Sequence, residues 1–362
     1  MSVRTAALLA FLAAACNANT TPVTKKAYDG KPPLGAPLTA SEAPAGTWSW
    51  VPFPDAICGD GSSTGLGVNP GTGADLVVFF DGGGACWSYE TCAAGLAMDR
   101  SYGPDTFAVE VANSLPGSVL DRAALPPSLA DATLVFVPYC TGDVHGGDAV
   151  QTYRNAITGA TEQWHHVGHA NVMRYLERLA ATWPQPARLV VAGSSAGGFG
   201  ALANYEAFRW YWPDAQGFLV DDSGPPLVGD DIAPSLRNAW YDAWHLGASL
   251  DPFCVACRTD MSAGIAAIAK AHKGDRIALL SHTQDLTMTA FLEQPLFEDA
   301  LHRLDAAVFA APATDNARMF LASGTDHMLL PTIGAQATGT WTLRDWLEAD
   351  VTGATTWGDV IP

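Results

Sequence analysis

One serine of this sequence stands in surroundings that suit nucleophilic catalysis. Ser195 is the centre of GSSAG at residues 193–197, which follows the apolar run RLVVA and precedes a stretch with helical periodicity. A strand, a tight turn and a helix in this order lift a serine hydroxyl clear of a sheet, and the flanking glycines permit the turn. The helix dipole then favours negative charge that develops beside the serine. Because the five-residue pattern also occurs in turns without chemistry, the flanking elements carry the prediction that Ser195 is an acyl-transfer nucleophile.

A serine hydroxyl needs a base, normally a histidine that a carboxylate orients. In folds with this motif the chain order is nucleophile, acid, base, and the base follows the last strand. His327, in GTDHMLL after the run ARMFLA, is the predicted base, and a solvent-facing loop histidine is the alternative. Asp285, which follows the run RIALLS, is the predicted acid. Its rival is Asp326, but Asp326 is next to His327 in the sequence, and the side chains of adjacent residues seldom face each other. Asp222, in DDSG, is expected to be a structural hydrogen-bonding carboxylate.

The tetrahedral intermediate of acyl transfer carries an oxyanion that preorganised N–H groups must stabilise. The run LVVFF leads directly into Asp81 and the three glycines 82–84, whose lack of side chains lets backbone amides approach a substrate oxygen. The amide of Ala196, the residue after the nucleophile, is the expected partner donor. The alternative interpretation of the glycines is a flexible turn without chemistry.

Histidines and a tryptophan outside these motifs could also contact a ligand. His165 and His169 are spaced like metal ligands on one helix face, but His166 stands where an HExxH motif has glutamate, which favours packing or capping and predicts no metal. His145, in CTGDVHGGD, is expected either to line the substrate pocket or to bond within its own loop. Trp87, beside the glycine run, is the best-placed candidate for a sugar-stacking platform, although most tryptophans in such a domain belong to the core.

Short apolar runs alternate with helical patterns along the chain. The runs are nearly continuous in hydrophobicity, which is typical of strands buried on both faces of a parallel sheet. The expected strands are 76–80, 133–137, 188–191, 217–220, 276–280 and 317–321. The expected helices are 171–182, 196–210, 234–246, 261–272 and 297–309. This alternation predicts a doubly wound α/β fold, with a mostly parallel sheet flanked by helices in the α/β-hydrolase manner.

The composition narrows the class of protein. Of the 362 residues, 48% are hydrophobic and 15% are charged, which excludes intrinsic disorder of the main body. The formal net charge of -18 would repel nucleic acid phosphates, so no nucleic acid partner is expected. Because the sequence contains no repeat and no internal linker, residues 47–362 are expected to form one esterase domain, and the protein is expected to be a monomer.

The N-terminus resembles an export signal. Residues 1–15 contain one arginine followed by an apolar stretch that ends in small residues, as secretory signal peptides do. Cys16 follows AAA in a pattern like a bacterial lipobox, which predicts a lipid anchor; ordinary cleavage near Ala15 and an incidental cysteine are the alternatives. Residues 16–46, rich in Thr, Ala, Pro and Gly, are expected to form a flexible tether. The protein is therefore expected to be secreted, periplasmic or a surface lipoprotein, with membrane contact only through that anchor.

An even number of cysteines remains once Cys16 is set aside, which predicts disulfides in an exported chain. By spacing, two pairs of near neighbours would close short loops and leave one long-range pair, although spacing alone does not fix the pairing. The expected pairs are Cys86 with Cys92, Cys254 with Cys257, and Cys58 with Cys140. The CVAC of residues 254–257 could instead be redox-active or half of a zinc site, but the sequence has no second CxxC to complete one.

These motifs resemble those of the pectin acetylesterase family, which includes the animal Notum carboxylesterases. The resemblance is carried in chain order by CGDGSSTG, FFDGGGACWSYETC, FVPYCTGDVHGG, AGSSAGG, DDSG and GTDH, which extend over most of the chain. It implies a catalytic triad formed by Ser195, Asp285 and His327. It implies oxyanion-hole positions at Gly83, Gly84 and Ala196, and supports the disulfides Cys86–Cys92 and Cys58–Cys140. The lipobox-like leader makes this chain the expected bacterial member.

Three features depart from the family pattern. Asp81 stands where the relatives have Glu, and Asp285 lies in a divergent stretch, SHTQDL. Residues 251–257, which are expected to cover the pocket, match no family motif. Because the pocket cover bears on substrate choice, the family resemblance leaves the substrate open.

The sequence thus predicts a serine esterase that removes acyl groups, expected to be acetyl, from a polysaccharide through an acyl-serine intermediate and without a cofactor. The alternatives are a lipase, thioesterase or polyesterase with the same residues, and a catalytically inactive carbohydrate-binding module on the same scaffold. An acidic surface repels a polyanion such as unesterified pectin, which favours neutral acetylated xylan or a small ester as substrate.

Overall fold

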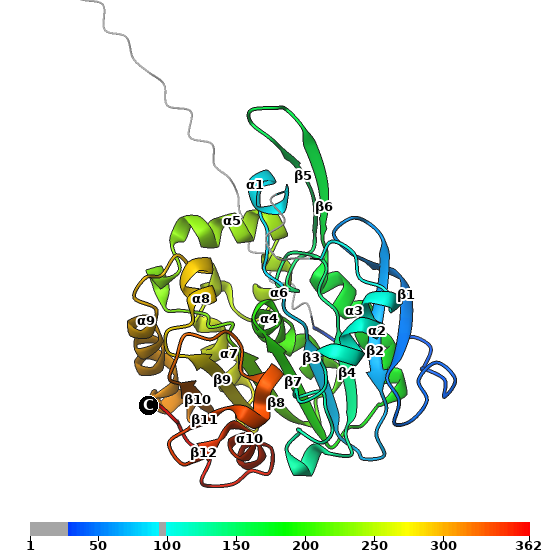
Figure 1. Ribbon diagram of the computed structural model, residues 1–362, viewed down its shortest axis with the longest axis vertical. Coiled ribbons are helices and arrows are strands. Elements are labelled where there is room, and N and C mark those ends of the chain that lie inside the picture. Colours follow the sequence, from blue (N-terminus) through cyan, green and yellow to red (C-terminus); the bar gives the residue numbers. More distant parts are fainter. Residues whose placement is uncertain (1–27, 94–98) are drawn as a thin grey trace, which may run out of the picture.

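A twisted sheet of eight strands forms the centre of the molecule (Figure 1). The structure is a computed structural model that describes residues 28–93 and 99–362. The expected signal peptide, residues 1–15, and the expected lipid-anchor residue Cys16 lie outside the described residues. In spatial order the strands are β1 (Ser49–Ile57), β2 (Ser63–Asn69), β4 (Thr133–Val137), β3 (Leu76–Phe80), β7 (Arg188–Ser194), β8 (Gln216–Asp222), β9 (Arg276–His282) and β10 (Ala317–Ala322).

The six strands from β4 to β10 are parallel, and β1 and β2 join them as an antiparallel pair at one edge. These six are the strands that the apolar runs predicted, and each prediction lies within the observed strand or coincides with it. The direction of chain travel across the sheet reverses between β3 and β7. In an open α/β sheet, ligands bind at such a switch point, beyond the carboxyl ends of the strands. The fold therefore points to the segments that follow β3 and β7.

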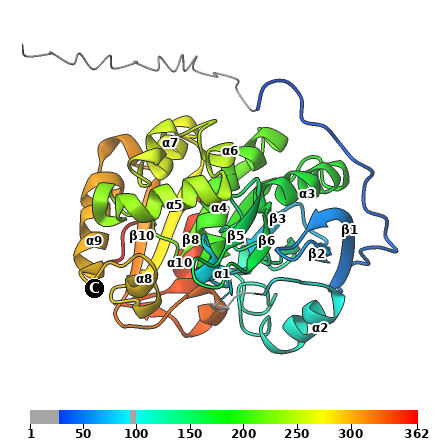
Figure 2. The ribbon, with the colours of Figure 1, turned by 90° about the horizontal axis from the view of Figure 1, so that it is seen from above.

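Alternating side chains of each strand enter two separate cores. In β3, for example, Val78 and Phe80 pack into one core and Val77 and Phe79 into the other. Figure 2 shows the helices on the two faces of the sheet. One face carries α3 (Gly168–Thr182), α4 (Ala196–Tyr211), α5 (Pro234–Trp244), α7 (Ala263–Ala271) and α9 (Phe297–Leu304). The other carries α2 (Pro104–Asn113) and α10 (Leu343–Val351).

Five of these helices are those that the periodicity predicted, within a few residues at each end. The expected helix 297–309 is divided, because α9 ends at Leu304 and a π-helix, Asp305–Phe309, continues it. Short helices complete the fold: α1 (Tyr89–Ala93), α6 (Gly247–Leu250), α8 (Leu286–Phe291) and the 3-10 turns Pro127–Leu129, Gly229–Asp231, Val255–Arg258, Pro312–Thr314 and Leu330–Ala335. Within the described part of the chain, no helix is long and apolar enough to cross a membrane.

Two hairpins lie outside the central sheet. The strands β5 (Ala149–Arg154) and β6 (Thr161–His166) pair antiparallel and project from the body above the carboxyl ends of the strands (Figure 1). The second hairpin joins β11 (Ala337–Thr338) to β12 (Trp341–Thr342) ahead of α10. His165 and His166 stand on the strand β6, whereas His169 is the second residue of α3. His165 and His169 therefore do not share one helix face, as the disfavoured metal interpretation would have required.

The described part of the expected tether, residues 28–46, packs against α3 rather than extending freely. Leu38 and Ala43 are buried in the core on that face. The amide of Gly35 donates to the carbonyl of Glu177, and Arg178 forms an ion pair with Glu42 at 2.8 Å. Residues 35–43 thus belong to the folded body.

The described residues contain three disulfides: Cys58–Cys140, Cys86–Cys92 and Cys254–Cys257. They are the pairs that the spacing favoured. The first joins the end of the β1 hairpin segment to the residues after β4, across 82 residues of sequence. The sulfurs of Cys86 and Cys92 lie near His166, but since they are bonded to each other they are not free to hold a metal ion.

Candidate active site

Ser195 occupies the turn between β7 and α4 in a strained backbone conformation. Its φ is 60° and its ψ is -121°, which few residues with a side chain adopt. The two glycines of the motif cannot be replaced by residues with side chains without a clash. A Cβ on Gly193 would lie 2.1 Å from the carbonyl oxygen of Gly197, and a Cβ on Gly197 would lie 2.0 Å from the carbonyl oxygen of Phe80. The turn therefore exists because both positions lack side chains, and it places the Ser195 hydroxyl at the N-terminus of α4.

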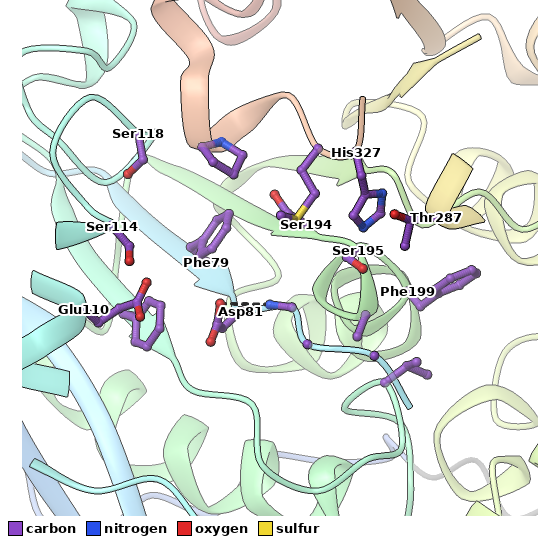
Figure 3. A pocket seen from close by; sticks show the side chains of 18 of the residues that line it. Phe79, Asp81, Glu110, Ser114, Ser118, Ser194, Ser195, Phe199, Thr287 and His327 are labelled. Atoms are coloured by element: carbon purple, nitrogen blue, oxygen red, sulfur yellow. Dashed lines mark hydrogen bonds between the residues drawn. The ribbon is translucent and has the colours of Figure 1, made fainter. Parts of the chain in front are cut away.

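His327 and Asp285 meet beside this turn. The Nδ1 atom of His327 is 2.7 Å from Oδ2 of Asp285, which is fully buried. The other carboxylate oxygen of Asp285 accepts a hydrogen bond of 2.9 Å from the amide of Met288 and so caps α8. Figure 3 shows the imidazole of His327 beside Ser195. The rival acid, Asp326, is exposed to solvent.

Asp222 connects the nucleophile turn with the loop that carries His327. Its buried carboxylate accepts hydrogen bonds from the hydroxyl of Ser194 at 2.7 Å and from the amides of Leu329 and Leu330 at 3.0 and 2.9 Å. Its own carbonyl oxygen accepts from the amide of Ser195 at 2.7 Å. Burial raises the pKa of Asp222, while these hydrogen bonds act in the opposite direction. Asp222 thus has the structural hydrogen-bonding arrangement that the sequence led us to expect.

The glycine run after β3 lines the same cavity as Ser195, and its three members differ. The amide of Gly82 donates to Oδ1 of Asp81 at 2.9 Å, so it is occupied. Gly83 and Gly84 have φ of 143° and 77°, which favour glycine, and among the described residues their amides donate to no backbone carbonyl. With Ala196 at the first position of α4, these are the residues that were expected to hold an oxyanion.

His145 is positioned behind the glycine run rather than in the cavity. It is 2% exposed, and its Nε2 donates to the carbonyl oxygen of Asp81 at 2.8 Å. Burial lowers the pKa of His145 to about 4, so the ring is neutral near neutral pH. Of the two expectations for His145, lining the pocket is wrong, because the neighbouring Val144 lines it instead. The other expectation, a bond within its own loop, is met by the backbone amide of His145, which donates to Oδ1 of Asp143 at 3.1 Å, while the side chain bonds outside the loop to Asp81.

Trp87 is also absent from the lining of the cavity. It packs edge-on against Trp240, Trp244 and Phe291, at ring-centroid distances of 6.1 to 6.3 Å. The stacking role expected for Trp87 is therefore not supported by its position, and its observed contacts are those of a core residue. Of this aromatic group, Phe291 reaches the cavity.

The histidines that were weighed as metal ligands bond to protein groups instead. His169 Nδ1 is 2.7 Å from the side-chain oxygen of Asn204, and His166 bonds to the hydroxyl of Tyr153 and the carbonyl of Thr141. Burial lowers the pKa of both rings, which keeps them neutral. These contacts agree with the packing interpretation that the sequence favoured.

A cavity of about 490 Å³ contains Ser195 and His327 (Figure 3). Figure 3 shows Glu110, Ser114 and Ser118 together with Phe79 at one end of the cavity, here called the polar end, and Phe199 with Thr287 at the other, here called the apolar end. The apolar end comprises Val144, Ala196, Phe199, Met288 and Phe291. The polar end comprises Asp81, Glu110, Ser114 and Ser118, and the hydrocarbon side chains of Phe79, Leu115, Leu120 and Phe136 line the cavity as well.

The carboxyl group of Asp81 is a weaker acid than that of an ordinary aspartate. Removal of its carboxyl group from bulk solvent raises its pKa to about 8, and the negative charge of Glu110 adds to this effect. Neither Glu110 nor the serines of the polar end belong to a motif, because they lie on α2 and the turns after it, in a stretch without chemical pattern. The sequence offered no signal for them, since only the fold brings α2 over the end of β3.

Comparisons with known proteins agree with this arrangement. A family model described as pectinacetylesterase matches residues 51–233. The palmitoleoyl-protein carboxylesterase notum1 of Xenopus laevis is 28% identical over 157 residues, covering 41% of this chain and 29% of the relative. The human palmitoleoyl-protein carboxylesterase NOTUM is 26% identical over 157 residues, with the same coverage of 41% and 29%. The chain thus matches less than a third of the length of these relatives.

A solved structure of the Wnt deacylase Notum from Drosophila superimposes with a TM-score of 0.59 at 16% identity, covering 88% of this chain and 95% of that one. At this identity the likeness concerns the fold, and it confirms the predicted α/β-hydrolase-like architecture. The family model covers half of the chain, including the glycine run and the nucleophile turn. The resemblance noted in the sequence is confirmed: the chain belongs to the pectinacetylesterase family.

Proposed function

We propose that this protein is a serine hydrolase of carboxylic esters. The observation that carries the proposal is the hydrogen bond of 2.7 Å between Asp285 and His327, beside a serine held in a strained turn within a cavity. A carboxylate on Nδ1 fixes the histidine tautomer whose Nε2 is free to accept the serine proton. The family to which the chain belongs agrees with this chemistry.

The reaction proceeds in two halves. Ser195 Oγ attacks the acyl carbon while His327 takes its proton, and the amides of Gly83, Gly84 and Ala196 bind the resulting oxyanion. The intermediate collapses as His327 returns the proton to the departing alcohol, which leaves an acyl-serine. His327 then takes a proton from a water molecule as it attacks the acyl-serine, and returns that proton to Ser195 Oγ as the acid is released. These steps use only side chains and amides of this chain, so the expectation that no cofactor takes part stands as part of the proposal.

The acyl group that fits the apolar end is short. Behind Phe199 and Phe291, next to this end, lies a pocket of about 20 Å³. That volume accommodates about one water-sized group. Acetyl therefore fits without displacing side chains, whereas a long acyl chain would require Phe199 or Phe291 to move. The relatives are named for palmitoleoyl esters, and this end of the cavity favours a smaller group here.

The alcohol portion of the substrate occupies the polar end. Carboxyl and hydroxyl groups there match the hydroxyl groups of a sugar, so an acetylated polysaccharide is the proposed natural substrate. Export, with or without a lipid on Cys16, agrees with the three disulfides, since such bonds persist in oxidising compartments. One esterase domain accounts for the continuous sheet and its two cores.

The experiment compares nitrophenyl esters of acetate, butyrate and octanoate with the wild-type protein and Ser195→Ala. Acetate is expected to react fastest, and Ser195→Ala is expected to lose activity on the order of 10³-fold or more. Equal rates for wild type and Ser195→Ala on every ester would overturn the proposal and favour a carbohydrate-binding module. Faster octanoate hydrolysis that depends on Ser195 would keep the serine esterase and assign it to lipid-like esters.

A further inference from the structure

The polar end of the cavity is an ordered group of side chains on one helix and one loop. Glu110 and Ser114 are four residues apart at the end of α2, a spacing that places them on one helix face. Ser118 follows in the next turn, where its hydroxyl donates to the carbonyl of Leu115. Figure 3 shows Glu110, Ser114 and Asp81 on the same side of the cavity, away from Phe199. An alcohol that leaves Ser195 toward this end would contact them.

This end carries negative charge without a balancing cation. Among the described residues that line the cavity, none is lysine or arginine. Neither Glu110 nor Asp81 takes part in any ion pair of the described chain. The two carboxyl groups influence each other, since the charge of Glu110 raises the pKa of Asp81. A group placed between them therefore meets one strong acceptor and one weakly acidic carboxyl.

We propose that Glu110, with Asp81, selects substrates by the charge of their alcohol portion: neutral and ammonium-bearing alcohols are accepted, and carboxylate-bearing ones are rejected. The proposal rests on the ester hydrolysis proposed above and concerns the same cavity. Pectin is a polymer of uronic acids, so an acetylated uronate would bring its carboxylate against two acidic side chains. A neutral sugar, or an amino sugar with a free ammonium group, would not be repelled.

Glu110 is the residue to change, because Asp81 has a second task. Oδ1 of Asp81 accepts from the amide of Gly82, and the Asp81 carbonyl accepts from His145, so a substitution there would disturb the glycine run. Glu110 lies near the end of α2 and is partly exposed. A matched control is Asp105, an exposed acid in the first turn of the same helix that does not line the cavity.

The test uses three aryl acetates that differ in one meta substituent: trimethylammonio, tert-butyl and carboxylate. The first two have the same shape and differ in charge. The measured quantity is kcat/KM for each charged ester divided by that for the neutral ester, compared among the wild type, Glu110→Gln and Asp105→Asn. Intrinsic ester reactivity cancels in this comparison between variants.

The cation-to-anion ratio is kcat/KM for the trimethylammonio ester divided by kcat/KM for the carboxylate ester. At low salt we expect this ratio to be about tenfold or more lower in Glu110→Gln than in the wild type, since one charge at close range accounts for such a factor. Asp105→Asn should keep the wild-type ratio. Added salt should reduce the wild-type ratio toward that of Glu110→Gln, because screening weakens the attraction. The salt series needs no variant, so a wild-type ratio that does not respond to salt would refute the proposal even if Glu110→Gln fails to fold.

Two results separate this proposal from the one on which it rests. If the neutral ester is hydrolysed through Ser195 but the ratios are the same in wild type and Glu110→Gln and do not respond to salt, charge selection is refuted and the esterase remains. If none of the esters is hydrolysed through Ser195, the esterase proposal itself fails. A preference of the wild type for the carboxylate ester would also overturn charge selection.

Discussion

Gly197→Ala tests whether the nucleophile turn depends on close backbone contact with the glycine run. A Cβ at this position would lie 2.0 Å from the carbonyl oxygen of Phe80, whereas ordinary contact begins at 3.4 Å. The backbone of Phe80 and the start of α4 must therefore move apart by more than 1 Å. Phe80 directly precedes Asp81 and the glycine run, so this movement separates the nucleophile from the amides proposed to hold the oxyanion.

Two effects of Gly197→Ala on stability oppose each other. Alanine is the better helix former at this position in α4 by about 1 kcal/mol. Overpacking a tightly packed site costs about 1–3 kcal/mol. Because the contact is with backbone rather than with a flexible side chain, we expect the cost to prevail, with a net loss of about 1–2 kcal/mol in the free energy of unfolding. The rate should fall more sharply, by about 10²-fold in kcat, since a misplacement of 1 Å in reacting groups has effects of that size.

The assay is kcat on nitrophenyl acetate together with urea unfolding. The control is Gly274→Ala, because a Cβ on Gly274 would meet no atom within 4 Å and its backbone conformation is ordinary. The control should retain wild-type kcat and stability within error. If Gly197→Ala keeps kcat within about threefold of the wild type, then backbone contact at this position does not set the catalytic geometry, and the reasoning fails.

Two further predictions follow from buried carboxyl groups. In Asp285→Asn the amide nitrogen would face His327 and leave Nε2 protonated, so kcat should fall by about 10³- to 10⁴-fold without loss of folding by circular dichroism; a smaller than tenfold loss would argue against Asp285 as the orienting acid. Asp350 is buried without a hydrogen-bond partner in the described chain, and burial raises its pKa from 3.8 to about 8. The folded protein therefore holds this proton where the unfolded chain releases it, so the stabilisation is complete below about pH 4 and is lost as the pH rises toward 8. Urea unfolding of Asp350→Asn should show a weaker decline across that window, and parallel curves for the two proteins would contradict the assignment.

Much of the candidate site was predictable because its residues are local to the ends of strands in the sequence. Each parallel strand is a short apolar run, and a residue within about five positions after each of three strands has a type and order that match a known reaction: Ser195, Asp285 and His327. The glycine run follows the same logic, since it comes directly after β3. In a parallel sheet all carboxyl ends share one edge, so order along the chain becomes proximity in space.

The remaining features depend on contacts that sequence patterns do not encode. The edge strand β1 contains two prolines, which an edge position tolerates. The buried strand β2 contains two glycines, because a Cβ on Gly65 or Gly67 would lie 2.2 Å from Val51 or Phe107. Neither strand therefore has a continuous apolar run. Residues 35–43 look like a linker by composition, yet Leu38 and Ala43 are buried in the core on the face that carries α3. Trp87 was a candidate for the cavity because it is near the glycine run in the sequence. Its side chain instead packs against Trp240 and Trp244 and does not line the cavity.

The bonds of Asp222 bear on how substrate enters. Because one buried carboxylate binds both the nucleophile turn and the residues after His327, these two segments are fastened to the sheet as a single unit. The loop of His327 is therefore unsuited to serve as a moving lid, since any opening would break several buried hydrogen bonds at once. Adaptation to a bulky polymer must come from the opposite wall, where α2 is held by side-chain packing and has no hydrogen-bonded side-chain cap at its N-terminus. Engineering of substrate range would accordingly begin with α2 and leave the loop of His327 unchanged.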